Sequence, residues 1–372
     1  MGLYPAEAPA SEFSFSDTYD PVTFSGARQS DARVWSFFSH VGPPSFQKEF
    51  EDYALGRNLT HRMPLYIKAE KPVTLQELFR ATRSHYEGMA LDNRDDVGAG
   101  PYHANFRVRP LAWQHDGKEY IHERHPGTQQ TGWHFVAQLR SGMPGPLAAV
   151  NWFGVDDTSF SVRVPFYGAT TRVPHCLADG NGNALSFSFE STFWVNNMVA
   201  NFAYEHAFAA PAILKEVEAR ELQYIEAIRA TDTEALRLFK ASPSEAAEFV
   251  TRFSDNLATS QTQDWLKLWQ RLFVQYRDGF NVTSAGKNAP DHGGSQGGVV
   301  PNVEERGYDK QWYGRIVKDA GKKYEVPKSD GVQGQAQVHK LRVLQKGLSH
   351  LNSGPASSAQ HATDSTSSPI VV

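Results

Sequence analysis

The chain has 372 residues, of which 40% are hydrophobic and 12% aromatic, and this length and composition suffice to bury a substantial core. Acidic residues outnumber basic ones by 41 to 37, so the net charge of −4 gives no electrostatic reason to expect a nucleic-acid partner. No stretch reaches the roughly 18 consecutive apolar residues of a membrane-spanning helix, so we expect no membrane partner.

The start of the chain and its cysteine content bear on the cellular compartment. Residues 1–12 form a flexible lead rich in Ala, Pro and Glu, without the basic start and apolar centre of a secretory signal. The single cysteine, Cys176, excludes an intramolecular disulfide and a cysteine-based zinc site. These features favour a cytoplasmic protein.

The first long segment, residues 13–110, combines short extended runs with one clear helix. Thr74 and Glu77 have the spacing of a capping box, which predicts that the helix begins there, and Gly88 is expected to end it.

Residues 118–170 predict strands, because apolar residues alternate or run together between turn residues. The strands are expected over residues 133–140, 147–153 and 159–164. Their short connections favour an antiparallel sheet.

From residue 189 to residue 278 the apolar residues recur at the spacing of a helix. Helices are expected over 189–208 and 211–230, in a short segment capped by Thr231, and from Ser242-Pro243 onward. Residues 281–306 are rich in Gly, Pro, Asn and Ser and are predicted to be a disordered insert. In residues 307–327 some patterning of apolar residues returns. Residues 328–372 are predicted to be a disordered low-complexity tail.

Two short motifs suggest chemistry that their context argues against. His122-Glu123-Arg124-His125 is followed by Pro126-Gly127, so it cannot present two histidines one helical turn apart, and we expect no metal site. Cys176 follows His175, but adjacent side chains of an extended chain point apart. We therefore interpret Cys176 as a bystander rather than a nucleophile.

Two polar residues lie in strands that are otherwise largely apolar. Arg140 ends one strand, and a buried arginine is costly unless it is paired. An ion pair with Asp156, Asp157 or Glu123 is the favoured interpretation, and a role in a functional site is the alternative. Asn151 lies within an apolar run and needs hydrogen-bond partners if it is buried.

Several colinear blocks resemble the cysteine dipeptidases, the family of dipeptidase A and the secernins. The resemblance covers residues 13–280 and, weakly, 307–326. The blocks are Ser16 to Phe24, Ala27-Arg28, Ala32 to Trp35, Arg83, His85 to Gly88, Gly100 to Tyr102, Glu123-Arg124, Gln129 to Gly132, Phe135 to Arg140, Trp152 to Gly154, Val164 to Tyr167, and Ser191 to Asn197.

This resemblance implies an N-terminal-nucleophile hydrolase. The implied fold is α+β, a four-layer αββα sandwich of two stacked antiparallel sheets, and residues 13–280 would form it incompletely. The implied reaction is hydrolysis of dipeptides, in which an N-terminal cysteine thiolate attacks the peptide carbonyl without a metal or other cofactor. By analogy of fold, Arg140 and Asn151 are candidates to support the nucleophile, and Glu123, Arg124 and Gln138 are candidates to bind the dipeptide.

The family places the nucleophilic cysteine and several strands before the block that starts here at Ser16. Met1 or Gly2 would lead this chain, and neither is a nucleophile. We therefore expect the later portion of a dipeptidase, which lacks the nucleophile and is inactive alone. The alternatives are a non-catalytic, secernin-like interaction protein and one subunit of a split enzyme, complemented by a separate N-terminal segment. Unpaired strand edges would also favour a homo-oligomer.

Overall fold

The computed structural model describes residues 4–5, 7–284 and 301–327. It contains two compact units, which divide the sequence between Val274 and Gln275. Helices and antiparallel sheets both occur, so the α+β class is confirmed. The sheets are the pair β1-β2, the three-stranded sheet β3-β4-β5 and the pair β6-β7.

The N-terminal part is more helical than the sequence indicated. Instead of extended runs, residues 15–54 form α1 (Phe15–Tyr19), α2 (Phe24–Gly26), a π-helical turn (Ala27–Asp31), α3 (Ala32–Val41), α4 (Phe46–Glu49) and α5 (Glu51–Ala54). Side-chain caps begin the first two, because Ser14 accepts from the Asp17 amide and Thr23 from the Gly26 amide. α1, α4 and α5 are too short to show a helical period, whereas α2, the π-helical turn and α3 form one continuous helical run that the prediction of extended runs missed.

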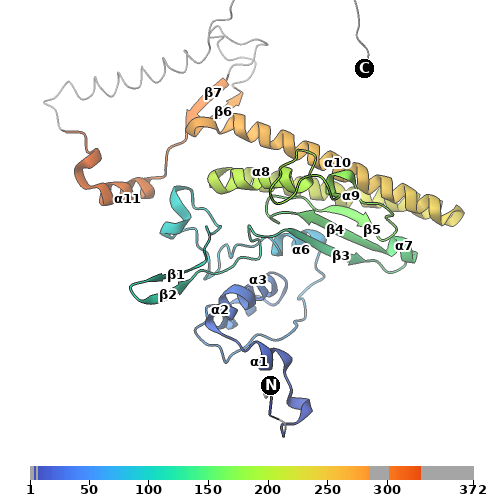
Figure 1. Cartoon of the computed structure of the whole chain (residues 1–372), viewed down its shortest axis with the longest axis horizontal. Helices are drawn as coiled ribbons and strands as arrows, with labels where there is room; N and C mark the ends of the chain where they lie inside the picture. Colours follow the sequence, from blue (N-terminus) through green and yellow to red (C-terminus); the bar gives the residue numbers. More distant parts are fainter. Residues whose placement is uncertain (1–3, 6, 285–300, 328–372) are drawn as a thin grey trace, which may run out of the picture. The chain divides into compact units, whose positions relative to one another are not determined.

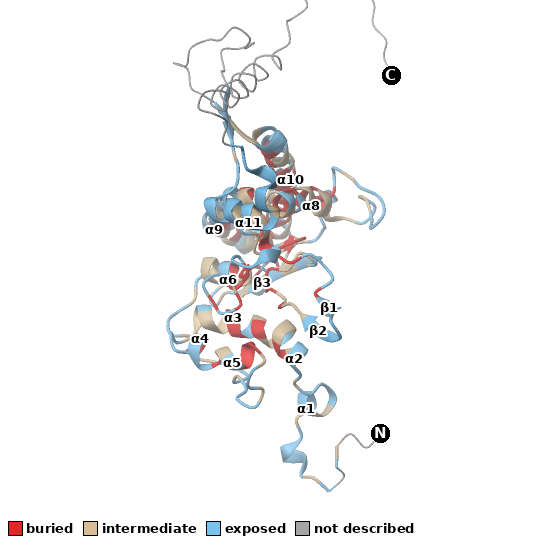
Figure 2. Cartoon of the chain, turned by 90° about the vertical axis from the view of Figure 1, so that its left-hand side faces the viewer, coloured by how far each residue is buried: buried red, intermediate tan, exposed pale blue. Residues whose placement is uncertain are grey.

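A local hydrophobic core holds these short helices together. Trp35 of α3 packs beside Tyr86, and Phe46 packs against Phe50. The Trp35 indole donates to the Gln47 carbonyl at 2.9 Å, so its polar atom is satisfied inside the core. Figure 2 shows buried residues gathered around α3 and α5, and again where the three-stranded sheet meets the long helices.

The predicted capping box is present at α6 (Leu75–Ala81), where Thr74 and Glu77 exchange both hydrogen bonds. The helix ends at Ala81 rather than at Gly88, so the predicted end was wrong. The chain turns away there because the next residues serve tertiary contacts, among them a hydrogen bond from Arg83 Nε to the Thr158 carbonyl.

The central sheet is antiparallel, as predicted. Its strands are β3 (Trp133–Leu139), β4 (Ala149–Val155) and β5 (Val164–Tyr167), and β4 pairs with both neighbours. A helical turn, α7 (Gly145–Ala148), precedes β4. The strand predicted over 159–164 was wrong in its span, because Phe160 and Ser161 fold back onto the Asp157 carbonyl and both alternating sets of side chains are buried.

A separate hairpin precedes this sheet. It consists of β1 (Ala112–His115) and β2 (Lys118–Ile121). Asp116 and Gly117 connect the strands, both with positive φ, which is the backbone that a tight two-residue hairpin loop requires.

The two faces of the central sheet differ sharply. Val150, Trp152 and Tyr167 are buried on one face, which the helices cover. On the other face Trp133, Phe135 and Leu139 are 61, 51 and 81% exposed. Successive side chains of a strand point to opposite faces. Here both faces carry large apolar side chains, although solvent reaches one of them.

Long helices cover the buried face of the sheet (Figure 1). They are α8 (Thr192–Glu205), α9 (Ala210–Ala241) and α10 (Pro243–Gln275). Ser242 and Pro243 start α10 as predicted. The break expected at Thr231 was wrong: α9 continues because Ile228, Thr231 and Ala235 stay on one buried face. None of the helices in the described ranges is both long and apolar enough to cross a membrane.

The second unit contains the remaining strands and helix. Its elements are β6 (Phe280–Ser284), β7 (Pro301–Glu305) and α11 (Lys310–Ala320). Residues 281–284 and 301–305 were predicted to be disordered but pair as antiparallel strands, with Val282 opposite Val303. The rest of the predicted insert and the predicted tail from 328 lie outside the described residues.

Short 3-10 turns complete the described structure. They lie at Ala10–Glu12, Val97–Tyr102, His175–Leu177, Ala207–Ala209, Arg277–Gly279 and Gly321–Tyr324.

A buried ion cluster ties α6 and β5 to α9. Glu221 of α9 is 2% exposed and accepts from Arg83 at 2.5 Å, while its distance to the Arg163 guanidinium is 3.4 Å. The Arg163 amide also donates to this carboxylate at 3.1 Å. Two buried arginines therefore share one carboxylate, which makes the cluster sensitive to loss of the acid.

We expect Glu221→Ala to lower the free energy of unfolding by about 3–5 kcal/mol, because it leaves both buried arginines without their carboxylate. Urea unfolding followed by circular dichroism measures the change. Glu218→Ala, one turn earlier in the same helix, is the matched control. Glu218 pairs with the exposed Arg80, and its loss should cost under about 1 kcal/mol. Equal losses in the two variants would contradict this account.

Candidate functional site

Glu123 is the centre of a buried polar cluster that follows β2. Its carboxylate accepts from Arg107 Nε at 2.8 Å and from Arg28 at 3.4 Å, and His125 Nε2 lies 3.6 Å away. Burial raises the pKa of Glu123, but His125 and Arg107 outweigh burial and hold the pKa below its usual range. Glu123 is therefore ionised and already engaged by protein cations.

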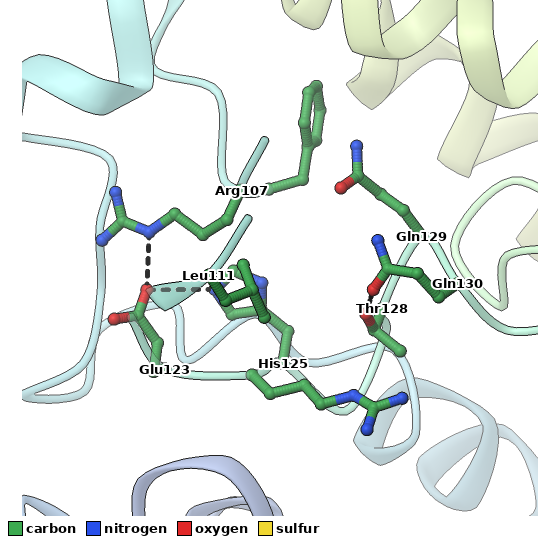
Figure 3. A pocket seen from close by; sticks show the side chains of 9 residues that line it. Arg107, Leu111, Glu123, His125, Thr128, Gln129 and Gln130 are labelled. Carbon is green, nitrogen blue, oxygen red and sulfur yellow. Dashed lines mark hydrogen bonds and ion pairs between the residues drawn. The ribbon is translucent and has the colours of Figure 1, made fainter. Parts of the chain in front are cut away.

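This cluster forms one wall of a small hollow (Figure 3). Figure 3 shows Arg107 and His125 directed at Glu123, while Gln129 and Gln130 lie across the hollow. The space of about 220 Å³ between these side chains includes open solvent, and the enclosed part is about 10 Å³, roughly the room of one water molecule. The lining residues are Phe106, Arg107, Leu111, Glu123, Arg124, His125, Thr128, Gln129 and Gln130.

The two histidines of the His122–His125 motif show no sign of a shared ligand. Burial lowers the pKa of His125, and it also lowers the pKa of His122, so both favour the neutral form. Within the described ranges no group of three or more His, Cys, Asp or Glu side chains is arranged to hold a metal ion.

Arg124 lines the same hollow and differs from its neighbours in having no carboxylate partner. Its backbone is fixed, because its carbonyl accepts from the Tyr86 hydroxyl at 2.7 Å. Its side-chain Nε is buried and makes no hydrogen bond within the described part of the chain. Of the three residues predicted to bind substrate, Glu123 and Arg124 are thus brought together.

Arg140 and Gln138 lie apart from that hollow, on the covered face of the sheet. Arg140 forms the predicted ion pair, but with Asp232 of α9 at 2.5 Å rather than with Asp156, Asp157 or Glu123. Its guanidinium also stacks over Tyr167, whose hydroxyl donates to Asp232 at 2.7 Å. Gln138 accepts from the Trp152 indole at 3.1 Å. Both side chains contact neighbours that anchor the sheet to its helices.

Asn151 lies on the opposite, open face of the sheet. It is exposed, and it pairs across the strands with Ala137 and Phe166. Because solvent reaches the Asn151 side chain, it does not need a buried hydrogen-bond partner. The structure separates Asn151 from Arg140 by the thickness of the sheet, so the two predicted supporting residues do not converge on one point within these described elements.

A site that the sequence analysis missed lies where β4 ends. Asp156 is buried, has a φ of 74° and accepts one hydrogen bond from the Asn197 side chain at 3.0 Å. Burial raises the pKa of this carboxyl to about 7, and the charge of Asp157 adds to the rise. Asp157 instead accepts from the Tyr204 hydroxyl at 2.6 Å and from the Ser159 amide at 2.8 Å.

The combination at Asp156 is typical of functional sites, because a strained backbone and a perturbed carboxyl rarely persist without a use. Asn197 also lines a surface hollow, together with the loop around Gly182 and with Trp194. The Asp-Asp pair directly after an apolar strand was the available signal, and we considered both residues only as possible ion-pair partners of Arg140.

Asp156 predicts a pH dependence of stability. Between about pH 4 and pH 7 the folded state keeps a proton that the unfolded state releases, so the free energy of unfolding falls as pH rises through this range. Asp156→Asn should remove this loss and raise stability at pH 8 by on the order of a few kcal/mol, with little effect at pH 4. Asparagine tolerates positive φ, so the backbone is preserved.

Thermal unfolding of the wild type and of Asp156→Asn at a series of pH values measures this effect. Asp157→Asn is the comparison variant: it keeps the Asp156 carboxyl, and because the charge of Asp157 is a smaller cause of the raised pKa than burial, it should remove only a minor part of the pH dependence. A parallel pH profile for the wild type and Asp156→Asn would refute the assignment.

Cys176 has no catalytic arrangement. Its side chain is buried, and the neighbouring His175 is exposed and directed to Glu190 at 3.2 Å. A thiol nucleophile needs a base or an electropositive setting, and His175 does not supply one here.

Comparison with known proteins places these observations in a family context. A model of peptidase family C69 matches residues 2–218, more than half of the chain. Dipeptidase A of Lactobacillus helveticus is 21% identical over 178 residues, which are 48% of this chain and 31% of that protein. A dipeptidase of Bifidobacterium longum (strain NCC 2705) is 23% identical over 188 residues, 50% of this chain and 31% of that protein. The match thus spans about a third of each curated relative.

Proposed function

This chain belongs to peptidase family C69, and we propose on that basis that it serves dipeptidase-type hydrolysis of peptide bonds by a cysteine thiolate. The family resemblance inferred from the sequence is confirmed. The single observation that carries the proposal is the family match, which includes β3, β4 and the Glu123 cluster. The names of both relatives, dipeptidases, support the substrate class.

The open face of the central sheet supports the finer fold assignment, an αββα sandwich. Trp133 stacks against Phe135 and Phe153, and Phe166 meets Phe153 edge-on, so aromatic side chains form a continuous apolar surface. Sheets of such sandwiches pack face to face about 10 Å apart through surfaces of this kind. We propose that a second sheet, formed by polypeptide outside the described residues, covers this face.

The chemistry proposed for this fold requires a thiolate other than Cys176. The thiolate sulfur attacks the peptide carbonyl carbon, the C–N bond breaks as the amine takes a proton, and water then cleaves the thioester. Because Cys176 is buried beside an exposed, carboxylate-bound His175, we propose that the nucleophile comes from polypeptide beyond residues 1–372. The part proposed for this chain is to bind and orient the peptide.

A second candidate function is favoured by the same open face. An exposed apolar patch of this kind also suits a protein that acts by contact, as a non-catalytic interaction protein or as one subunit of a split enzyme. The two candidates differ in whether the natural protein turns over dipeptides.

The test is hydrolysis of free dipeptides by the protein isolated from its source cells. We expect turnover of alanyl-alanine. The N-acetylated peptide should be hydrolysed at least about tenfold more slowly, because an exopeptidase recognises the free terminus of its substrate. Chromatographic detection of released alanine measures both rates. Absence of turnover in a folded, complete protein would favour the interaction protein instead.

Substitution of the only cysteine in this chain separates the two thiol assignments. Cys176→Ser should leave dipeptide turnover unchanged within about twofold, because the thiol is buried and the adjacent His175 is exposed and pairs with Glu190. Loss of turnover in a variant that keeps its circular dichroism spectrum would overturn the proposal that Cys176 is a bystander.

A further inference from the structure

The first turn of α8 presents backbone donors that no described group uses. Val195 is the first residue whose amide joins the hydrogen bonding of the helix, because it donates to the Ser191 carbonyl at 3.0 Å. The amides of Thr192, Phe193 and Trp194 have no hydrogen-bond partner among the described residues. Such amides occur at the start of every helix, where side-chain caps, water or ligands satisfy them. The first turn of α8 contains no acidic residue to balance their partial positive charge.

Ser191 occupies the N-cap position of α8 but does not cap the helix. A serine hydroxyl at this position normally accepts from an amide two or three residues ahead. Ser242 does so at α10, where the Glu245 amide donates to its Oγ at 3.4 Å. Ser191 is only 8% exposed, and its hydroxyl has no hydrogen-bond partner in the described part of the chain. Because an unpaired polar group that is more than nine-tenths buried costs free energy, a bound partner is expected at this hydroxyl.

Ser191 and the first turn line the surface hollow that Asn197 also borders, and we call this space the α8 hollow. It offers about 520 Å³, which lies within the roughly 300–1,000 Å³ of small-molecule sites. Phe193 and Trp194 supply aromatic walls. The loop at Gly182 completes the hollow: a Cβ there would lie 2.9 Å from Trp194 Nε1, so glycine lets the loop approach the indole closely.

The lining of the α8 hollow is uncharged and rich in donors. None of the described residues that line it is Asp, Glu, Lys, Arg or His. Asn183 Oδ1 accepts from the Leu185 amide at 2.9 Å, which fixes this lining side chain and leaves its N–H groups without a partner in the described ranges. Glu190, which precedes Ser191, is exposed and pairs with His175 at 3.2 Å. The hollow therefore offers donors to an acceptor, beside the positive end of a 14-residue helix.

We propose that the α8 hollow binds the α-carboxylate of a short peptide, with Ser191 and the first-turn amides of α8 as donors. That the carboxylate belongs to a peptide rests on the proposed function. A carboxylate accepts several hydrogen bonds and donates none, which matches a set of donors at a helix N-terminus. Phe193 and Trp194 would contact the last side chain of the peptide, so a large apolar residue is favoured there.

The Glu123 cluster is a poorer place for the same carboxylate. Arg107 and Arg28 already pair with Glu123, and the enclosed space beside it is about 10 Å³. The α8 hollow has the larger space, and its donors are not engaged by a protein carboxylate.

Calorimetric titration of the full chain with alanyl-phenylalanine and with alanyl-phenylalaninamide tests this site without requiring turnover. The titration is made at pH 6, because Asp156, whose partner Asn197 lines the hollow, keeps its proton there. The amide should bind at least about tenfold more weakly, because it lacks the charge. Ser191→Ala should weaken binding of the peptide about tenfold without lowering the Tm, because this hydroxyl caps nothing in the free protein.

Ser242→Ala is the matched control, because it removes a serine hydroxyl from the N-cap of another long helix. This hydroxyl does accept from a backbone amide, so its loss should lower the Tm by about 2 °C. Binding of alanyl-phenylalanine by this variant should equal that of the wild type.

Equal affinity for the peptide and its amide, or unchanged binding by a folded Ser191→Ala variant, would overturn the site. Inorganic phosphate that binds as tightly as alanyl-phenylalanine would leave an anion site and overturn the peptide ligand. Carboxylate-dependent binding by a natural protein that does not hydrolyse dipeptides would support the site and contradict the proposed function. Dipeptide hydrolysis with an unchanged KM in Ser191→Ala would contradict the site alone.

Discussion

The carboxylate of Glu221 is the interaction on which the rest of the first unit depends. It receives the Arg83 and Arg163 side chains and the Arg163 amide, which belong to segments 80 residues apart in the sequence. The cluster fixes the end of α6 and the approach to β5 against α9. Phe79 can then pack edge-on against Trp152, and the covered face of the sheet closes. The cluster is sensitive to its one carboxylate, because two buried arginines share it and its loss would leave their charges in a medium of low polarity.

Because helices cover only one face of the central sheet, its other apolar face stays open. Arg140, Asp232 and Tyr167 anchor the same covered face near the end of β3, so the helices cannot also protect Trp133 or Phe135. An apolar face of this extent is typical of an interface. The sandwich that we propose accounts for it, and the same face would serve a contact partner in the alternative function.

Features with a local physical cause were predictable from the sequence. The capping box at Thr74, the start of α10 at Ser242-Pro243 and the strands β3 and β4 depend on neighbours a few residues away. Features set by tertiary contacts were not. Thr231 looks like a helix cap, yet it stays inside α9 because burial of that face outweighs the capping preference.

The candidate site divides in the same way. The sequence singled out Arg140 because a charge that ends an apolar strand is visible in the pattern, whereas Glu123 and Arg124 were named by analogy with the family. It could not show that Arg140 meets Asp232, 92 residues away, or that the Arg124 Nε is buried without a hydrogen-bond partner among the described residues. The strained backbone of Asp156 was also invisible, since an Asp-Asp pair is ordinary at the end of a strand.

The central claim is that peptide hydrolysis in this protein uses a cysteine other than Cys176. Alkylation of the natural protein with iodoacetamide, followed by peptide mass mapping, tests it most directly. The account predicts loss of dipeptide turnover in step with labelling of a cysteine outside residues 1–372, while the buried Cys176 reacts slowly. Inactivation that follows labelling of Cys176, or full activity after complete alkylation, would contradict it.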